Sequence, residues 1–260
     1  MARADRHNAQ NYDMLYEIND ALDLAMYDDD VSVVVVAADG KNFSSGHDLD
    51  GIGAPNNPVL GFGGHEHPGP QGYMAKEQDF YLGLCWRWRN LPKPIIAQVQ
   101  GKAIAGGLML IWPFDIIIAS DDAEFSDPVV AFGLNGHEYF VHAWEVGHRK
   151  ARQMLYTGEP IGAEEAHRLG MVNEIVARDR LEEFTLDMAS KVALRPAAGL
   201  KLAKMSVNQS QDAQGMWTAL QSAFALHQFG HANNRVNLGS LVDPSGAAVI
   251  RNQARQEKPK

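Results

Sequence analysis

The sequence predicts an α/β protein, in which a parallel sheet is covered by helices and followed by a helical layer. Residues 31–38 (VSVVVVAA) are apolar on both faces, which is typical of a central strand that helices cover, and residues 95–99 and 115–119 are predicted to be two further buried strands. From residue 139 onward the apolar residues recur mainly at helical spacing. Strands and helices that alternate early and give way to helices late favour a parallel-sheet core with a helical C-terminal layer.

The composition fits one soluble domain with a full core. The chain has 260 residues, of which 45% are hydrophobic and 21% charged. Its net charge of −9 argues against nucleic-acid binding and against an anionic membrane surface. The single cysteine, Cys85, fits a reducing compartment. Because the sequence has no apolar run long enough to span a bilayer and no signal-peptide core, we expect a cytoplasmic protein.

Periodicity predicts the remaining elements in order. We expect short strands near residues 124–125 and 172–176, and helices over residues 8–28, 73–90, 139–157, 163–169, 180–193, 196–209 and 212–231. On the last helix, Trp217, Leu220, Phe224 and Phe229 are predicted to share one buried stripe. We therefore expect an α/β core over residues 1–192, a C-terminal helical region over residues 193–242, and a flexible polar tail over residues 243–260.

Residues 51–72 are rich in Gly, Pro, Asn and His and have no periodicity, so we expect a long loop. His65 and His67 lie in this stretch and could ligate a metal. No carboxylate or thiol cluster in the sequence completes such a site, and we expect no metal.

The stretch at residues 93–119 has a glycine turn between two strands, with Gly101, Gly106 and Gly107. Glycine lets the backbone approach another group closely and leaves the first N–H groups of a following helix free to donate. Such N–H groups can hold an anion or stabilise an oxyanion, although tight packing alone would also explain the glycines.

Four motifs together resemble the enoyl-CoA hydratase/isomerase (crotonase) superfamily over nearly the whole chain. Residues 6–11 (RHNAQN) are similar to its RNALN-like start, and residues 43–49 (FSSGHDL) to its FxAGxDL element. Residues 93–115 resemble KPxIAAVxGxAxGGGxxLxxxCD, and residues 157–173 resemble TGxxxxAxEAxxxGLVN. The resemblance implies a crotonase (ClpP-like) fold of repeated ββα units, with C-terminal helices that build a homotrimer, often paired into a hexamer.

The resemblance also implies a ligand and a site. The ligand is an acyl-CoA thioester, so CoA enters with the substrate and no separate cofactor is implied. The backbone N–H groups at His47 and Gly106 match the family's donors to the thioester carbonyl, which stabilise an enolate. The CoA portion is expected to run past His47, Asp48, Leu49 and Asp50.

The chain departs from this pattern at the family's two catalytic glutamates, which fall on Met109 and Val129. Neither side chain can move a proton, so we expect conventional hydratase activity to be impaired. His137, Glu138 and Asp127 lie nearby in sequence and are candidate acids or bases, as is the side chain of His47. A helix cap or a surface ion pair would also explain any one of them.

These observations predict a cytoplasmic acyl-CoA lyase or isomerase with an intact oxyanion site and nonstandard acid/base residues. A noncatalytic acyl-CoA-binding or assembly protein of the same fold is the alternative. RNA binding is seen in one relative, but this chain is acidic and has no stripe of basic residues along a helix that would support it. The strand hairpin that precedes the RNALN-like element in the family is not evident before residue 6, so either the start codon is misassigned, the sequence is truncated, or the strands are absent. If they are absent, we expect a sheet edge to be left unpaired.

Overall fold

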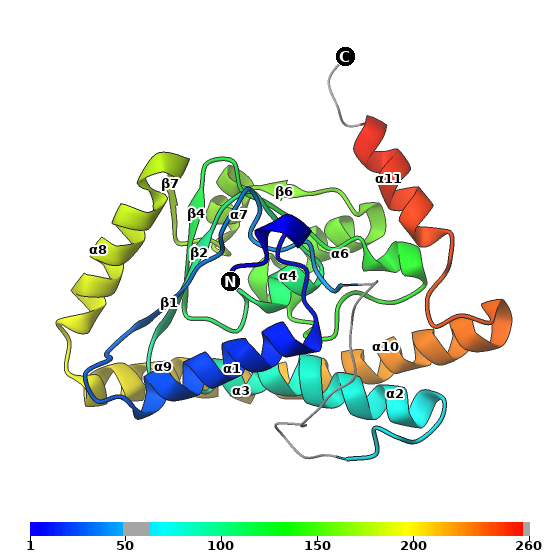
Figure 1. The fold of residues 1–260 in the computed structure, drawn as a ribbon, viewed down its shortest axis with the longest axis horizontal. Helices are drawn as coiled ribbons and strands as arrows, with labels where there is room; N and C mark the ends of the chain where they lie inside the picture. The colour runs from blue at the N-terminus through cyan, green and yellow to red at the C-terminus, as the bar shows by residue number, and fades with distance from the viewer. Residues whose placement is uncertain (49–62, 257–260) are drawn as a thin grey trace.

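The computed structural model describes residues 1–48 and 63–256, with the side chains of residues 254–256 excepted. Its centre is a parallel sheet in the order β1-β2-β4-β7, and a smaller sheet in the order β3-β5-β6 lies beside it (Figure 1). The larger sheet contains β1 (Val34–Val36), β2 (Ile95–Val99), β4 (Ile116–Ser120) and β7 (Glu174–Val176). The smaller contains β3 (Lys102–Ile104), β5 (Glu124–Ser126) and β6 (Ile161–Gly162), with β6 antiparallel to β5.

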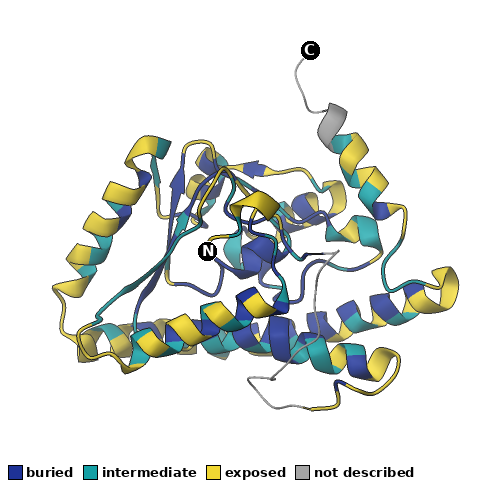
Figure 2. Ribbon diagram, viewed as in Figure 1, coloured by how far each residue is buried: buried dark blue, intermediate teal, exposed yellow. Residues whose placement is uncertain are grey.

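Helices cover the larger sheet on both faces. One face packs on α8 (Leu181–Ala193) through Ile96, Ile118 and Leu181, while the other faces the main core (Figure 2). The remaining helices of the described chain are η1 (Ala4–Arg6), α1 (Tyr12–Tyr27), α2 (Pro70–Glu77), η2 (Gln78–Gly83), α3 (Leu84–Arg89), α4 (Gly106–Met109), η3 (Val129–Phe132), α5 (His142–Glu145), α6 (His148–Thr157), α7 (Ala163–Leu169), η4 (Arg178–Arg180), α9 (Ala197–Ala213), α10 (Met216–Leu238) and α11 (Gly246–Gln256). No helix of this described part is long and apolar enough to cross a bilayer.

The predicted α/β class with a C-terminal helical region is confirmed, and β2 and α7 have their predicted bounds. The predicted helix over residues 139–157 is wrong in its first part. Residues 139–141 are not helical, and Gly147, at φ 76°, separates α5 from α6. The predicted helix over residues 73–90 is one run of α2, η2 and α3, in which η2 is a π-helical segment.

The buried face of α10 differs from the predicted stripe. Leu220 and Phe224 are buried, but the Phe229 side chain is 68% exposed. His227, His231 and Asn234 continue the buried face instead. Residue 229 lies off this stripe because the positions that share a helix face with 220 and 224 are 227 and 231.

Residues 246–256, which were predicted to belong to a flexible tail, form helix α11 in the structure. The backbone N–H of Asp243 donates to the carbonyl of Phe132, 2.9 Å away. A Cβ at Gly246 would lie 2.7 Å from the carbonyl oxygen of Ala131, so α11 begins in close contact with η3. Ala247, Ile250 and Ala254, three and four residues apart in a largely polar stretch, were the available helical signal.

At the edge of the larger sheet, β1 continues into residues that pair with the chain start. The amino group of Met1 donates to the carbonyl of Ala37 at 2.7 Å, and the N–H of Asp39 donates to the carbonyl of Met1 at 2.9 Å.

An ion pair joins α9 to the sheet. The Nζ of Lys204 lies 2.8 Å from Oδ2 of Asp115, which also accepts the N–H of Ile95 at 2.8 Å. The Lys204 side chain is 5% exposed. We expect Asp115→Asn to lower the free energy of unfolding by roughly 3 kcal/mol, because the buried Lys204 cation loses its carboxylate.

Urea denaturation checks this, with Asp187→Asn as the matched control. The Lys191–Asp187 pair is at 2.6 Å but its side chains are 63% and 57% exposed, so the control should cost less than about 1 kcal/mol. Equal losses in the two variants would contradict a structural role for the Lys204 pair.

Candidate active site

The segment at residues 44–47 packs against the start of α4, and glycines make this approach possible. A Cβ at Gly46, whose φ is +92°, would lie 2.8 Å from the carbonyl oxygen of Ile104. A Cβ at Gly107 would lie 2.6 Å from the carbonyl oxygen of Ser44. Contacts this close to backbone atoms leave no room for a side chain, so both positions require glycine. We call this contact between residues 44–47 and 104–107 the glycine junction.

The backbone N–H groups of His47 and Gly106 lie at the glycine junction, and neither donates to a described residue. Gly106 is the first residue of α4, where helical N–H groups lack acceptors within the helix. Ala105 before it has a positive φ of 47°, a strained conformation that turns the chain from β3 into α4.

Gln10 forms hydrogen bonds to both sides of the glycine junction. Its backbone N–H donates to the carbonyl of Gly46, and its carbonyl accepts the N–H of Asp48, both at 2.8 Å. Its side-chain Nε2 donates to the carbonyl of Gly106. The two free N–H groups are therefore held by fixed backbone, and fixed donors suit the stabilisation of a developing negative charge.

A cavity of about 380 Å³ opens beside the junction, and both His47 and Gly106 line it. We call it the site cavity. Its other walls come from α1, α2, η2, η3, the 134–138 segment, α10 and α11. Apolar and aromatic side chains, including Tyr12 and Phe132, dominate it, and a few polar groups project in. This size and lining are typical of a small-molecule site.

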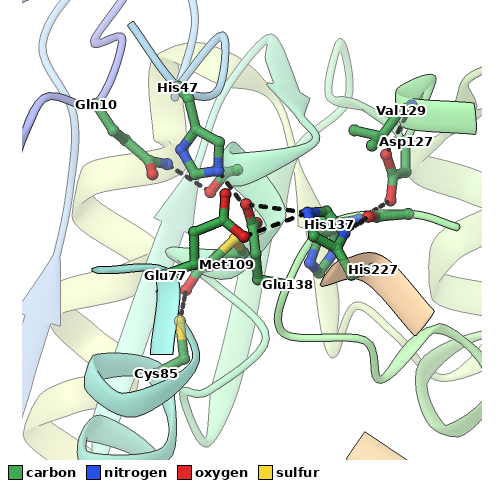
Figure 3. A network of polar contacts seen from close by, with 12 residues as sticks. Gln10, His47, Glu77, Cys85, Met109, Asp127, Val129, His137, Glu138 and His227 are labelled. Carbon is green, nitrogen blue, oxygen red and sulfur yellow. Dashed lines mark hydrogen bonds and ion pairs between the residues drawn. The ribbon is translucent and has the colours of Figure 1, made fainter. Parts of the chain in front are cut away.

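Glu138 is the acidic group that the structure brings to the junction. Its Oε2 lies 3.2 Å from Nε2 of His47 (Figure 3). The His47 ring stacks on Tyr81 at 4.0 Å between centroids. Burial disfavours charge on His47, but the Glu138 carboxylate outweighs it and raises the pKa of the imidazole. Burial likewise opposes ionisation of Glu138, yet His47 holds the pKa of that carboxyl well below its usual range. The two form a buried ion pair.

His137 and Asp127 have different surroundings from Glu138. The ring of His137 lines the site cavity, and neither of its nitrogens hydrogen-bonds to a described residue. Burial, reinforced by the neighbouring His142, lowers its pKa to about 3, so this imidazole is neutral at physiological pH.

Asp127 is fully buried and does not line the site cavity. Its carboxylate accepts hydrogen bonds from Nε2 of His142 at 2.8 Å and from the N–H groups of His137 at 2.9 Å and Val129 at 3.1 Å. These bonds indicate a structural role, and the position of Asp127 does not support its predicted role as an acid or base.

The positions of the two expected glutamates are apolar in the structure as well as in sequence. Val129 lines the site cavity, whereas Met109, in α4, is 2% exposed and does not. The carbonyl of Met109 accepts from the thiol of Cys85 at 3.4 Å. No proton-transferring side chain occupies either position.

The predicted CoA-binding residues are only partly described. Asp48 pairs with Arg3 at 2.7 Å and does not line the site cavity, while Leu49 and Asp50 lie outside the described residues. The two histidines that were considered as metal ligands, His65 and His67, do not form a shared site. Nε2 of His65 lies 2.6 Å from Oδ2 of Asp79, and His67 belongs to no group of metal-ligating side chains among the described residues.

Three buried residues of the site cavity were missed from the sequence: Glu77, His227 and His231. Oε1 of Glu77 lies 3.1 Å from Nε2 of His231, and its Oε2 lies 3.7 Å from Nε2 of His227. The two histidines are four apart on α10, a spacing that puts them on one helix face and could have been noticed. Glu77 comes from α2, far away in sequence, and no pattern pointed to it.

The bonds of Asp127 predict a pH-dependent stability. Burial alone would raise its pKa, but the facing histidines His142 and His137 lower it from 3.8 to about 2. A depressed pKa stabilises the fold above the unfolded value and loses that contribution as pH falls through the folded one. We expect the difference in unfolding free energy between wild type and Asp127→Asn to shrink by roughly 2 kcal/mol between pH 5 and pH 2. Denaturant titrations across that range measure it, and a constant difference would contradict the charged role.

Comparisons with known proteins agree with this architecture. The sequence profile of the enoyl-CoA hydratase/isomerase family matches residues 1–237. A putative enoyl-CoA hydratase of Mycobacterium tuberculosis, EchA13, is 42% identical over 240 residues, which cover 89% of this chain and 76% of the relative.

Solved structures show the same fold. A probable enoyl-CoA hydratase from Mycobacterium smegmatis is similar at a TM-score of 0.85 and 45% identity, over 92% of each chain. An enoyl-CoA hydratase/isomerase from Xanthobacter autotrophicus is similar at a TM-score of 0.80 and 28% identity, over 98% of this chain and 92% of that one. This chain therefore belongs to the enoyl-CoA hydratase/isomerase family and has the crotonase fold.

Proposed function

We propose that this protein is an acyl-CoA enzyme that moves a proton next to the thioester carbonyl, using His47 and Glu138 in place of the family's two glutamates. The observation that carries the proposal is the position of this ion pair beside the two free N–H groups of the glycine junction. The proposed chemistry is that of an isomerase or lyase, and it passes through a thioester enolate.

The glycine junction would supply the oxyanion site. An enolate concentrates negative charge on the carbonyl oxygen, and the N–H groups of His47 and Gly106 are the available donors. Because they are fixed and face an apolar cavity, they need not reorganise as charge develops. One such donor contributes about 2.7–4 kcal/mol in comparable enzymes.

The ion pair would supply the proton transfer. The His47 ring lies against Gly106, where a Cβ would come within 2.7 Å of its Cε1. A proton shared between His47 and Glu138 is therefore close to the position where a bound thioester carbonyl would lie. Glu138 orients the imidazole and stabilises its charged form, as a carboxylate does for a histidine in other acid–base pairs.

The apolar side chains of Met109 and Val129 favour proton transfer over conventional hydration, because hydration needs groups that hold and activate a water molecule. With crotonyl-CoA, we expect a hydration rate at least about tenfold below that of an ordinary hydratase, on the general scale of acid–base contributions. The same two residues support the second candidate function, a noncatalytic acyl-CoA-binding protein.

We also propose that the chain assembles as a homotrimer or a dimer of trimers through its C-terminal helices. Apolar side chains on α9 and α10 support this, since Leu202, Val207, Phe229 and Val236 are 62%, 60%, 68% and 83% exposed. Exposed apolar side chains of this kind mark protein interfaces. Light scattering after gel filtration should give three or six times the 28.6 kDa chain mass, and a monomer would contradict the proposal.

Exchange of the proton next to the thioester carbonyl tests the catalytic proposal. In D₂O, wild type should incorporate deuterium into a saturated or unsaturated acyl-CoA, followed by mass spectrometry. Glu138→Gln and His47→Asn should each lower the exchange rate by roughly 10²–10⁴-fold, because each removes one partner of the proton-transferring pair. The matched control is Glu165→Gln, at a surface ion pair with Lys150.

Two outcomes separate the candidates. Exchange by Glu138→Gln at the wild-type rate, with the variant folded by circular dichroism, would contradict the role of the ion pair. Tight acyl-CoA binding by wild type without any exchange or turnover across a library of thioesters would instead establish the noncatalytic binder.

A further inference from the structure

A group of buried imidazole and carboxylate side chains lies at one side of the site cavity and takes no part in the proposed proton transfer. It consists of Glu77, at the end of α2, and His227 and His231, on α10. Their exposed fractions are 5%, 2% and 5%. We call it the Glu77 cluster.

The hydrogen bonds of the two histidines fix which ring nitrogen faces Glu77. Nδ1 of His227 lies 2.8 Å from the carbonyl oxygen of Gly136, and Nδ1 of His231 lies 2.8 Å from the carbonyl oxygen of Leu241. A carbonyl oxygen only accepts hydrogen bonds, so each Nδ1 carries the hydrogen. In the neutral rings, both Nε2 atoms therefore present a lone pair to the cluster, which is how histidines that ligate metals are usually oriented.

Nε2 of His227 is the unexplained atom of this group. It is buried and makes no hydrogen bond to a described residue, and it lies 3.7 Å from Oε2 of Glu77 and 3.7 Å from Oε1 of Glu138 (Figure 3). Both neighbours are carboxylates, which present lone pairs when ionised. A cation between them would satisfy the imidazole and offset the negative charge that the two glutamates bring into a buried place.

The spacing of the atoms suits a small divalent ion. All three ligand atoms of the Glu77 cluster lie within 4.8 Å of one another. A tetrahedral Zn²⁺ at 2.0–2.1 Å from each ligand holds them roughly 3.3 Å apart. Each imidazole Nε2 lies near one oxygen of Glu77, that of His231 at 3.1 Å from Oε1 and that of His227 at 3.7 Å from Oε2, so small side-chain rotations would bring one oxygen to that spacing. Two histidines four apart on a helix are also a recurrent zinc-binding spacing.

A second group of histidines lacks these properties. Asp127, His137 and His142 are equally close together, but the carboxylate of Asp127 already accepts the Nε2 hydrogen of His142 and two backbone N–H groups. Among the described residues, the carboxylate of Glu77 accepts one hydrogen bond, from Nε2 of Gln228 to Oε2 at 2.5 Å, and so keeps more of its lone pairs than Asp127, whose group serves as a comparison.

We infer that the Glu77 cluster is a binding site for a divalent transition-metal ion, of which Zn²⁺ best suits two imidazoles and one carboxylate. Glu77, His227 and His231 are its ligands, and Glu138 lies near enough to approach the ion through the side that faces His227. The open side of the site faces the cavity, where a water molecule or a substrate oxygen can complete the coordination. The inference does not depend on the proposed reaction, because metal binding is measured without substrate.

Metal titration of the untagged full-length protein tests this inference. After treatment with a chelator and its removal, the protein is titrated with Zn²⁺ by calorimetry and with Co²⁺ by visible absorption. We expect one ion per chain, a Co²⁺ spectrum of low coordination number, and a higher melting temperature with Zn²⁺, because an ion that binds only the folded state stabilises it.

Variants then locate the ion. His231→Ala and the shape-conserving Glu77→Gln should each weaken Zn²⁺ binding by roughly 100-fold, on the scale of losses in metal sites. The matched control is His167→Ala, because Nδ1 of His167 also faces a carbonyl oxygen, that of Val172 at 3.1 Å, without belonging to a metal-ligating group.

Two results would overturn the inference. One is the absence of saturable binding in folded wild type at up to about 100 µM Zn²⁺, well above the affinities of built zinc sites. The other is binding that Glu77→Gln and His231→Ala leave unchanged. Either result would assign the cluster to an ion-pair network in which protonated histidine, rather than a metal ion, balances the charge of Glu77.

Discussion

The close approach of residues 44–47 to the start of α4 is the constraint on which the site depends. It brings the backbone of one loop within contact distance of the first turn of a helix, at a place where β3 and α4 meet. Gly46 and Gly107 make the approach possible, because a Cβ at either would collide with a backbone carbonyl. The strained φ of Ala105 and the three hydrogen bonds of Gln10 maintain it. The N–H groups of His47 and Gly106, which donate to no described residue, are the consequence.

The polar residues of the cavity are organised around that junction by charge. Glu138 faces His47 on one side and His227 on the other, and Glu77 faces His227 and His231. Burying two carboxylates is costly unless cations accompany them. His47 is the cation that accompanies Glu138, and either a protonated histidine or a metal ion accompanies Glu77. The proton chemistry and the metal site thus follow from the same electrostatic requirement, although they are tested separately.

Sequence reasoning went furthest where local rules decide the outcome. The strand at residues 95–99 and the helix at residues 163–169 were predicted with their bounds, because a buried apolar run and a glycine stop are local signals. The glycine turn with Gly101, Gly106 and Gly107 was predicted from the sequence, since it follows a strand, whereas its pairing with His47 was implied only by the family resemblance. The predicted helix over residues 139–157 is interrupted at Gly147, and Phe229 lies on the exposed face of α10 and not in the core. Tertiary packing determines both outcomes, so local sequence patterns did not predict them. Glu77 could not be predicted, since its partners are on a helix 150 residues later and only the folded chain brings them together.

The central claim is that the N–H groups of His47 and Gly106 polarise a bound thioester carbonyl. Infrared difference spectroscopy with an acyl-CoA labelled by ¹³C at that carbonyl measures this directly, without turnover and without substitution of the protein. Two fixed donors should lower the stretching frequency of the bound carbonyl relative to the free thioester, because they weaken its double bond. A bound carbonyl that absorbs at the frequency of the free thioester in water would contradict the account.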